Sequence, residues 1–477
     1  MKAMRNLLLQ AREEEMILAV LENGILSDLA VESAESRDLV GGIYKGIVKN
    51  VVPSLNGMFV DIGIAKNGFL RMKNIQQNHA EGEAILVQVE KDSTETKGPL
   101  LTEKIGLPGK YAVALFHTDY IGISKKIRKE ETREKLRLEV QKICPAGMGV
   151  IVRTAAESIE PDIFRRDLMN LRNIGEIIQK RFRVEKGPAL LYREGDLAVR
   201  AFRDYMTGDT ECLITNDRKI YQRLLDMASR ESEEEQKKIR LYESEIPLFT
   251  GYHVDEQLEG LFQREVSLES GGSIVIDYTE ALTAIDVNSG SFRSKGLPHS
   301  ELAFLVNCSA AKEIARQIRL RAIGGIIMVD FLDMDRESHK EKLLELLRQE
   351  VRKDHVKTVV CGMTSLGLVE ITRKRTGHRL YEKYYENCPC CHGTGKILTG
   401  TSMAERILRD LEKKRMIGPF KTGIRIRCCE EAAEILNKPV NQQHLRKIVN
   451  HDVLIESRDY KNRLTYEISF AEDWEGQ

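Results

Sequence analysis

Acidic and amide side chains follow apolar, strand-like runs at two places in the chain. In the segment TAIDVNSG, strand alternation puts Asp286 and Asn288 on one face and the apolar residues on the other. In GGIIMVDFLDMD, an apolar run beginning at Ile326 ends at Asp330, and we expect this strand to be buried on both faces. Mg²⁺ is typically held by one or two carboxylates together with phosphate oxygens of a substrate. Asp286, Asn288 and Asp330 are therefore a candidate open magnesium site suited to phosphodiester cleavage.

The alternative for these aspartates is that each one caps a turn at the end of its strand, which is common. Against it, a lone carboxylate at the end of so apolar a strand is costly unless it is paired or metal-bound. The intervening residues 299 to 321 predict a helix, so the two strands would be neighbours if the crossover is right-handed. On this helix Lys312, Arg316 and Arg319 either face phosphate or are ordinary solvated charges.

A second group of metal-binding side chains is the string CPCC. Cys388 and Cys391 form a C-x-x-C pair, and two thiolates are half of a tetrahedral zinc site. A complete site needs Cys390, His392, a remote residue, or the same pair from a second subunit on a two-fold axis. Unligated cysteines are the alternative, but the Gly-x-Gly turn that follows is typical of a zinc knuckle.

Length, charge and cysteine usage limit the class of protein. A chain of 477 residues exceeds one hydrophobic core, so we expect several domains. Lys plus Arg (73) balances Asp plus Glu (73), so any affinity for nucleic acid must come from local basic faces. The scattered cysteines are not a disulfide framework, and no stretch reaches the roughly 18 apolar residues of a membrane span. We expect a soluble, cytoplasmic protein.

The remaining pattern predicts the elements that position these groups. The turn Asn23-Gly24 predicts a hairpin near the amino terminus. Residues 42 to 73 contain short strands broken by turns, as in a small β-barrel, with Phe59 and Phe69 spaced to share one surface patch. Residues 271 to 333 alternate strand, helix and strand. The charged run at residues 231 to 238 predicts a solvated helix face or loop.

The strings TEALTAIDVNSGSF, EIARQIRLRAIGGIIMVDFLDMD and GLVEITRKRTGHR resemble the catalytic DNase I-like domain of the ribonuclease E/G family. The resemblance implies that Asp286 and Asp330 coordinate catalytic Mg²⁺ while Asn288 supports the site. A metal-bound water or hydroxide would then attack the scissile phosphate in line. It also implies that Asp333 supports the centre without binding the metal directly.

In the same family the C-P-x-C motif is a zinc link that joins two protomers. The resemblance therefore implies a homodimer with Zn²⁺ shared through Cys388 and Cys391. Here the variable position is itself Cys390, which leaves the choice of ligands open. Whether two such dimers pair further also stays open.

Residues 42 to 103 resemble the OB-fold RNA-binding domain of the family, in the strings YKGIVKNVVPSLNGMFVDIG and NGFL. The resemblance implies that Phe59 and Phe69 stack on unpaired bases while Lys91 and Lys97 meet phosphates. Spacing alone favours a place in the barrel core for one of the two phenylalanines.

The stretch from Gly109 to Thr154 is similar to the family's sensor of a 5′-monophosphate, which is carried over onto Gly109, Val113, Arg153 and Thr154. An arginine binds phosphate bidentately, a threonine hydroxyl adds a donor, and backbone N–H groups near a glycine approach closely. The alternative is a purely structural Arg-Thr pair at a strand end.

The expected fold is multidomain α+β, with an OB-fold and a sensor inserted into an RNase H-like domain. The expected domains are an RNase H-like structural domain (1–37 and 200–261), an OB-fold (38–103), a 5′-sensor region (104–199), a DNase I-like α/β catalytic domain (262–386), a zinc link (387–396) and a small α/β carboxy-terminal domain (397–477). Because the sequence stops at Gln477 without a long extension, it is more similar to ribonuclease G, or a bare catalytic half, than to ribonuclease E.

These features together predict a Mg²⁺-dependent endoribonuclease that cleaves single-stranded RNA. The resemblance implies stimulation by a 5′-monophosphate and a place in rRNA and tRNA processing and in mRNA decay. One alternative is a non-catalytic RNA-binding protein that uses the OB-fold and zinc link as a clamp, which leaves the three polar strand residues without a reason. The other is a metal-dependent DNase.

Overall fold

The computed structural model describes residues 4–33, 39–75, 78–93, 97–116, 118–144, 147–157, 159–290, 299–375, 379–391, 393–458 and 465–470. The chain divides into two compact units, Met1–Lys383 and Tyr384–Gln477. Several sheets, each with helices and a core of its own, make it a mixed α/β, multidomain protein, as the length predicted. No helix of the described residues is both long and apolar enough to cross a membrane.

The first sheet joins the amino terminus to a segment far along the chain, in the order β15-β14-β1-β2-β3. Its strands are β1 (Arg5–Ala11), β2 (Glu15–Glu22), β3 (Ile25–Ser33), β14 (Thr210–Thr215) and β15 (Ile239–Leu241). The predicted hairpin is confirmed as β2 and β3, with φ of 53° at Asn23 and 81° at Gly24, the positive values that tight hairpin turns require. β1 is buried on both faces, which explains its continuous apolar run.

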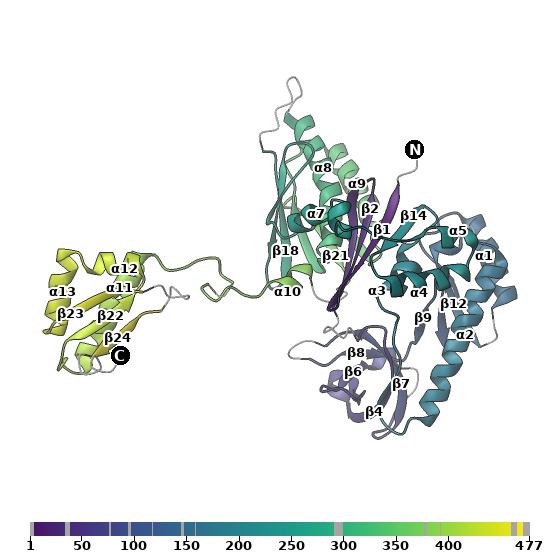
Figure 1. Cartoon of the computed structure of the whole chain (residues 1–477), viewed down its shortest axis with the longest axis horizontal. Coiled ribbons are helices and arrows are strands. Elements are labelled where there is room, and N and C mark those ends of the chain that lie inside the picture. Colours follow the sequence, from purple (N-terminus) through teal and green to yellow (C-terminus); the bar gives the residue numbers. More distant parts are fainter. Residues whose placement is uncertain are drawn as a thin grey trace. The chain divides into compact units, whose positions relative to one another are not determined.

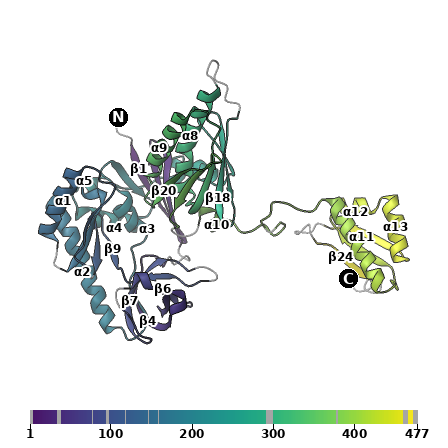
Figure 2. The same ribbon diagram turned by 180° about the vertical axis from the view of Figure 1, so that it is seen from behind.

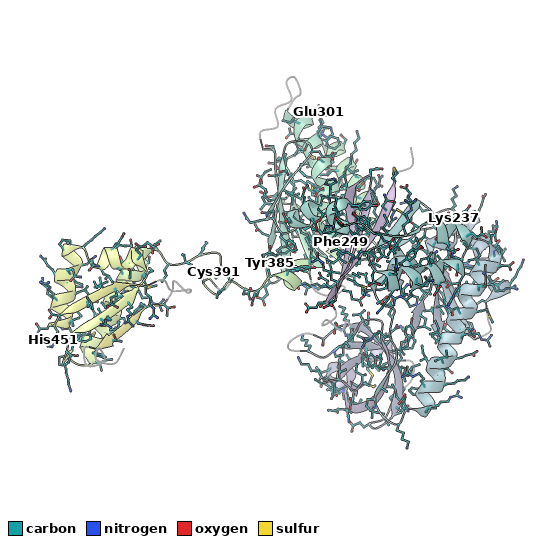
Figure 3. All side chains as sticks on the ribbon, in the orientation of Figure 1. Lys237, Phe249, Glu301, Tyr385, Cys391 and His451 are labelled. Atoms are coloured by element: carbon teal, nitrogen blue, oxygen red, sulfur yellow. The ribbon has the colours of Figure 1, made fainter. Side chains whose placement is uncertain are left out.

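Short helices cover both faces of this sheet. They are α3 (Leu197–Arg200), the π-helical turn η4 (Ala201–Tyr205), α4 (Arg218–Ser229), α5 (Glu233–Lys237), α6 (Leu248–Gly251) and α7 (Asp255–Gly260). Leu7 and Leu9 pack on the side of α3, η4 and α4, whereas Leu8 packs with Phe249 of α6 (Figure 3). The core therefore continues through the sheet.

A second sheet closes into a small barrel, because β4 pairs with both β5 and β7. Its elements are β4 (Ile43–Val52), η1 (Pro53–Leu55), β5 (Gly57–Asp61), β6 (Gly68–Arg71), η2 (Met72–Asn74), β7 (Ala84–Lys91) and β8 (Leu100–Thr102), with β13 (Ala189–Tyr192) added at β4. Met58, Val60 and Leu70 are buried inside it. The barrel predicted from the alternating pattern is present.

A third sheet, in the order β11-β12-β10-β9, carries two helices. Its elements are β9 (Gly106–Pro108), β10 (Ala112–Phe116), β11 (Ile121–Ile123), α1 (Glu130–Ile143), β12 (Met148–Val152), η3 (Thr154–Ala156) and α2 (Pro161–Val184). Leu136 and Val140 of α1 and Leu168 and Leu171 of α2 fill its core.

The fourth sheet, in the order β16-β17-β18-β19-β21-β20, has helices on one face. Its elements are β16 (Glu265–Ser267), β17 (Ser273–Tyr278), β18 (Leu282–Asn288), α8 (His299–Leu320), β19 (Gly325–Asp330), α9 (Glu337–Val351), β20 (Thr358–Met363) and β21 (Val369–Arg373), followed by α10 (Leu380–Tyr384). α8 and α9 lie side by side against the sheet in both views (Figures 1 and 2). The predicted helix between the two aspartate strands is confirmed as α8.

The carboxy-terminal unit has a three-stranded sheet in the order β23-β22-β24. Its elements are α11 (Gly400–Ile417), β22 (Ile424–Cys428), α12 (Glu430–Leu436), α13 (Pro439–Val449), β23 (Val453–Ser457) and β24 (Glu467–Phe470). A separate core, including Ile407, Leu411 and Leu445, holds the helices on the sheet.

Candidate active site

Asp286 and Asp330 lie side by side on neighbouring parallel strands. β18 pairs with β19, and Asp286 is the register partner of Asp330, the last residue of its strand. Partners in a parallel pair point to the same face, and neighbouring strands are roughly 4.8 Å apart. The sheet thus brings together two carboxylates that are distant in the sequence.

The open face of the sheet, opposite α8 and α9, presents these groups to solvent. Asp286, Asn288 and Asp330 are exposed, whereas Ile285 and Val287 are buried against the helices, as strand alternation predicted. The Asn288 side-chain amide donates a hydrogen bond of 2.9 Å to Asp286 Oδ2. No lysine or arginine in the described part of the chain pairs with either carboxylate. Two adjacent, uncompensated negative charges favour a bound cation.

The expectation that β19 is buried on both faces is wrong. Ile326 is 51% exposed, and Met328 is only partly buried, while Ile327 and Val329 are fully buried. Helices cover only one side of this sheet, and an apolar run cannot reveal which face lacks a cover.

Sequence reasoning missed a third carboxylate on the open face. Glu370 of β21 is exposed and is the register partner of Met328, so it points to the same side as Asp330. The alternating burial of the string VEITR was the signal that could have found it. Asp333, beyond the end of β19, is exposed and lines a shallow cavity of about 220 Å³ with Met334 and Lys340.

Two cations of α8, Arg316 and Arg319, form contacts away from this face. Arg316 pairs with Glu313 at 2.7 Å and donates to the carbonyl of Leu26, and Arg319 donates to the carbonyls of Ser27 and Glu350. They join the helix to β3 and α9. Of the two readings left open by the sequence, a role at the catalytic phosphate is therefore wrong for Arg316 and Arg319.

The two phenylalanines of the barrel lie on its outer surface. Phe59 and Phe69 are register partners on β5 and β6, with ring centroids 5.3 Å apart, and both are half-buried. The pairing continues from Phe69 to Leu100 and from Leu100 to the exposed Lys91. Neither ring is in the barrel core, so the expectation from spacing alone is wrong. Phe59, Phe69, Leu100 and Lys91 form one row, which we call the barrel row; Lys97 is exposed in the approach to β8.

The residues with sensor-like spacing also come together. Arg153 donates a hydrogen bond of 2.6 Å to the carbonyl of Gly109 and pairs with Asp204 at 2.7 Å. Thr154 follows directly, and Val113 on β10 pairs with Ile151 of β12, two residues before Arg153. Both contacts of Arg153 use Nη1, so Nε and Nη2 have no partner among the described residues and remain for a ligand.

Comparison with known proteins identifies the family of the chain. The profile described as the Ribonuclease E/G family matches residues 106–376. Ribonuclease G of Escherichia coli (strain K12) is 35% identical over 428 residues, which cover 85% of this chain and 87% of that protein. The chain belongs to the ribonuclease E/G family.

Ribonuclease E of Haemophilus influenzae is 34% identical over 472 residues, and ribonuclease E of Escherichia coli (strain K12) is 36% identical over 433 residues. These matches cover 95% and 87% of this chain but only 50% and 41% of those proteins. The expected enzyme class, an endoribonuclease, is thus the class of the family to which the chain belongs.

In this ribonuclease E/G family member, several polar partners of the residues with sensor-like spacing were not found by sequence reasoning. Asp204 is far from Arg153 in the sequence, and no local pattern links them. The Ser124 hydroxyl lies 3.4 Å from that of Thr154. A Cβ on Gly109 would lie 2.7 Å from the Asp167 carboxylate, so any larger residue here would displace the Asp167 side chain. Burial raises the pKa of Asp167.

The charged run at residues 231 to 238 includes the helix α5, whose Glu233, Glu234 and Lys237 are exposed as expected, but other residues of the run make specific contacts. Glu231 accepts a hydrogen bond of 2.5 Å from the Tyr111 hydroxyl, and Glu235 pairs with Lys110 at 3.2 Å and with Lys238 at 2.6 Å. The run therefore attaches the first sheet's helices to the segment that begins at Gly109.

The cysteine string lies in the stretch without regular structure that leads to α11, where Figure 3 labels Tyr385 and Cys391. Backbone N–H groups of Cys391 and Cys390 lower the pKa of the exposed Cys388 thiol, and the N–H of Gly395 donates to Cys391 Sγ at 3.3 Å. Within the described residues no three or more potential metal ligands gather, and His392 lies outside them.

Proposed function

We propose that the chain is a Mg²⁺-dependent endoribonuclease that hydrolyses single-stranded RNA at the open face of its fourth sheet. The observation that carries this proposal is the register pairing of Asp286 with Asp330, both exposed and neither compensated by a cation of the described residues. The family to which the chain belongs supports the same reaction class.

The donor set fits magnesium. Mg²⁺ prefers oxygen ligands, keeps several waters and needs only one or two carboxylates beside substrate phosphate. Bound between Asp286 and Asp330, it would offset charge on the scissile phosphate and make a bound water a better nucleophile. Asn288 holds the Asp286 carboxylate by its 2.9 Å hydrogen bond, and the paired strands fix the spacing of the two acids. Asp333 and Glu370 add negative charge around this centre without belonging to the pair.

The barrel row would hold the substrate. Aromatic faces stack on unpaired bases without strong sequence preference, and the exposed Lys91 at the end of the row suits a backbone phosphate. We assign Lys97 the same phosphate-binding role. A duplex, whose bases are already stacked, gains nothing from such a row, which supports single-stranded RNA as the substrate.

The residues around Arg153 would bind the 5′-monophosphate of that RNA and stimulate cleavage. Two guanidinium nitrogens remain for a bidentate contact, the hydroxyls of Thr154 and Ser124 add donors, and Val113 and Gly109 shape the surface. Such an enzyme would act in rRNA and tRNA processing and in mRNA decay, the processes that the family resemblance implies.

We also propose that Zn²⁺ links two copies of the chain through Cys388 and Cys391 of each. One chain supplies half of a tetrahedral sulfur site, and the lowered pKa of the Cys388 thiol favours the thiolate form that binds zinc. The double substitution Cys388→Ser, Cys391→Ser should release zinc and convert dimers to monomers in sedimentation. The matched control Cys361→Ser alters an exposed cysteine outside the link. A zinc-free double variant that remains dimeric would contradict the shared site.

One assay tests the main proposal. A short fluorescent single-stranded RNA, carrying either a 5′-monophosphate or a 5′-hydroxyl, is incubated with the chain with and without Mg²⁺. We expect cleavage only with Mg²⁺, and faster with the monophosphate. A DNA of the same sequence should remain intact, since its cleavage would favour the metal-dependent DNase. Tight RNA binding with no cleavage under any condition would favour the non-catalytic clamp.

A further inference from the structure

A large polar cleft lies within residues 1–383, away from Asp330. It has a volume of about 730 Å³. Arg373 in its wall is the register partner of Gly325, the first residue of β19, whereas Asp330 is the last residue of that strand. The cleft is therefore at the other end of the strand from the proposed magnesium site.

Three sheets contribute to the cleft wall. Its polar lining residues are Asp28 of β3, Lys66 and Asp92 of the barrel turns, Arg200 and Tyr205 near η4, Arg319 of α8, Asp354 and His355 before β20, Arg373 of β21, and Lys383. Apolar side chains, among them Leu39, Ile64 and Val356, fill the spaces between them. The cleft therefore offers both apolar contact surface and many groups that can form hydrogen bonds or ion pairs with a ligand.

Several of these polar groups have donor atoms without a hydrogen-bond partner among the described residues. The Tyr205 hydroxyl and both ring nitrogens of His355 make no hydrogen bond to a described residue; the nearest acidic atom to His355 is Asp28 Oδ2 at 3.7 Å. Arg319 is 8% exposed and uses Nε and Nη1 for backbone carbonyls, which leaves Nη2 without a partner in the same part of the chain. Partly buried donors without partners are costly unless water or a ligand satisfies them.

The cleft also has an excess of positive charge. Arg373 is neutralised by Asp354 at 2.7 Å, with both side chains almost fully buried. Arg200 is paired in the same way with Glu32 at 2.8 Å. The remaining charged lining groups are the cations Lys66, Arg319 and Lys383 and the carboxylates of Asp28 and Asp92. An anion with several hydrogen-bond acceptors would balance this charge.

We propose that this cleft binds a nucleotide. Its phosphate would meet the cations at Arg319 and Lys66, and the Tyr205 hydroxyl and the His355 ring would donate to its acceptors. The Asp28 carboxylate would accept from ribose hydroxyl or base amino groups, and the apolar walls at Ile64 and Val356 would contact the base. The same chemistry is offered by a free mononucleotide and by one nucleotide unit of an RNA chain.

Calorimetry on the full-length chain carrying Asp330→Asn, without Mg²⁺, tests binding independently of cleavage. The probes are AMP, inorganic phosphate and a short single-stranded RNA. Tyr205→Phe deletes a hydroxyl that makes no hydrogen bond to a described residue, so the variant should fold normally and weaken binding about fivefold or more. Lys66→Gln should weaken binding similarly. Tyr221→Phe, on α4 outside the cleft, is the matched control and should change nothing.

Weaker AMP binding in both cleft variants, with Tyr221→Phe unchanged, supports the proposal with a free nucleotide as ligand. No AMP binding, but weaker RNA binding in both cleft variants, supports it with RNA as the source. The proposal is overturned if inorganic phosphate binds as well as AMP, or if neither AMP nor RNA binding responds to Tyr205→Phe and Lys66→Gln.

Discussion

The two sites that would handle phosphate in this chain are built in opposite ways. At the open face, Asp286 and Asp330 are exposed and lack a compensating charge among the described residues. At the sensor-like site, Arg153 already has the Gly109 carbonyl and the Asp204 carboxylate as partners. The first region has a local excess of negative charge, whereas the second is nearly neutral before any ligand binds.

This difference indicates where binding energy is available. An uncompensated pair of acids gains a large electrostatic stabilisation when a divalent ion binds, and that ion can act on a reacting phosphate. A cation that already has a carboxylate partner gains less from a second anion, because the first anion screens its charge. We therefore expect large effects of substitution at the open face and graded effects at Arg153.

The largest effect is expected for Asp330→Asn, which removes one of the two charges. Loss of several kcal/mol of transition-state stabilisation lowers the rate of RNA cleavage by about 10³-fold. RNA affinity, measured by fluorescence anisotropy, should stay nearly unchanged. Asp277→Asn is the matched control, since Asp277 is on the neighbouring β17 but is already paired with Arg264 at 2.6 Å. Equal cleavage by Asp330→Asn and wild type would remove Asp330 from the active site.

Arg153→Ala should abolish the preference for a 5′-monophosphate and leave cleavage of 5′-hydroxyl RNA unchanged. A charge-assisted hydrogen bond contributes about 1.5–3 kcal/mol, which corresponds to roughly 10- to 100-fold in the ratio of the two rates. Arg153→Lys should restore only part of the preference, because lysine cannot bind bidentately. Arg172→Ala, on the exposed surface of α2, serves as the control. A retained preference in Arg153→Ala would contradict the sensor assignment.

Replacing Phe59 and Phe69 together by leucine keeps apolar volume but removes both stacking faces. Stacking contributes about 1–3 kcal/mol per base, so single-stranded RNA affinity should fall roughly tenfold or more, with a smaller effect on duplex RNA. The comparison is made with Phe262→Leu, outside the barrel. An equal loss of affinity for single-stranded and duplex RNA would indicate that the barrel row does not bind unpaired bases.

The smallest effect is expected for Asp204→Asn. This substitution tests how much Asp204, the partner of Arg153, contributes to the free energy of unfolding. Burial opposes ionisation of Asp204, but hydrogen bonds and charge from Arg203 and Arg153 outweigh it and lower its pKa. A lowered pKa in the folded state adds stability above the usual aspartate pKa of about 3.9, and this stability is lost as the pH falls through the folded-state value. The variant should be less stable by about 1–2 kcal/mol at pH 7 in urea unfolding, and the difference should shrink in acid. A constant difference across this range would contradict an electrostatic origin.

Local periodicity was enough to predict β18, α8 and β19 of the fourth sheet. The alternation around Asp286, the helix after it and the place of Asp330 at a strand end are all properties of short windows. The exposure of Ile326 was not predictable, because it depends on the absence of a helical layer from one face. The pairing of Arg153 with Asp204, and the gathering of Tyr205 and His355 at one cleft, depend on tertiary contacts between segments far apart in the sequence.

The barrel is a second case in which the local sequence pattern predicted the strands but not which side chains are buried. Strand and turn patterns predicted the barrel, but spacing alone placed one phenylalanine inside it. Register decides the matter, because Phe59 and Phe69 are partners on the outer surface, and register is set by pairing across the whole barrel. The functional roles of both residues remain predictions.

The parallel pairing of β18 with β19 has no tight turn of its own, so the packing of α8 and the hairpin of β17 with β18 hold its alignment. A displacement of β18 by a single residue would bury Asp286 among the aliphatic side chains beneath the sheet and turn Ile285 or Val287 outward. An insertion or deletion in this strand would thus destroy the core and the acidic pair in one event. Selection for a folded protein and selection for a working enzyme act here on the same alignment.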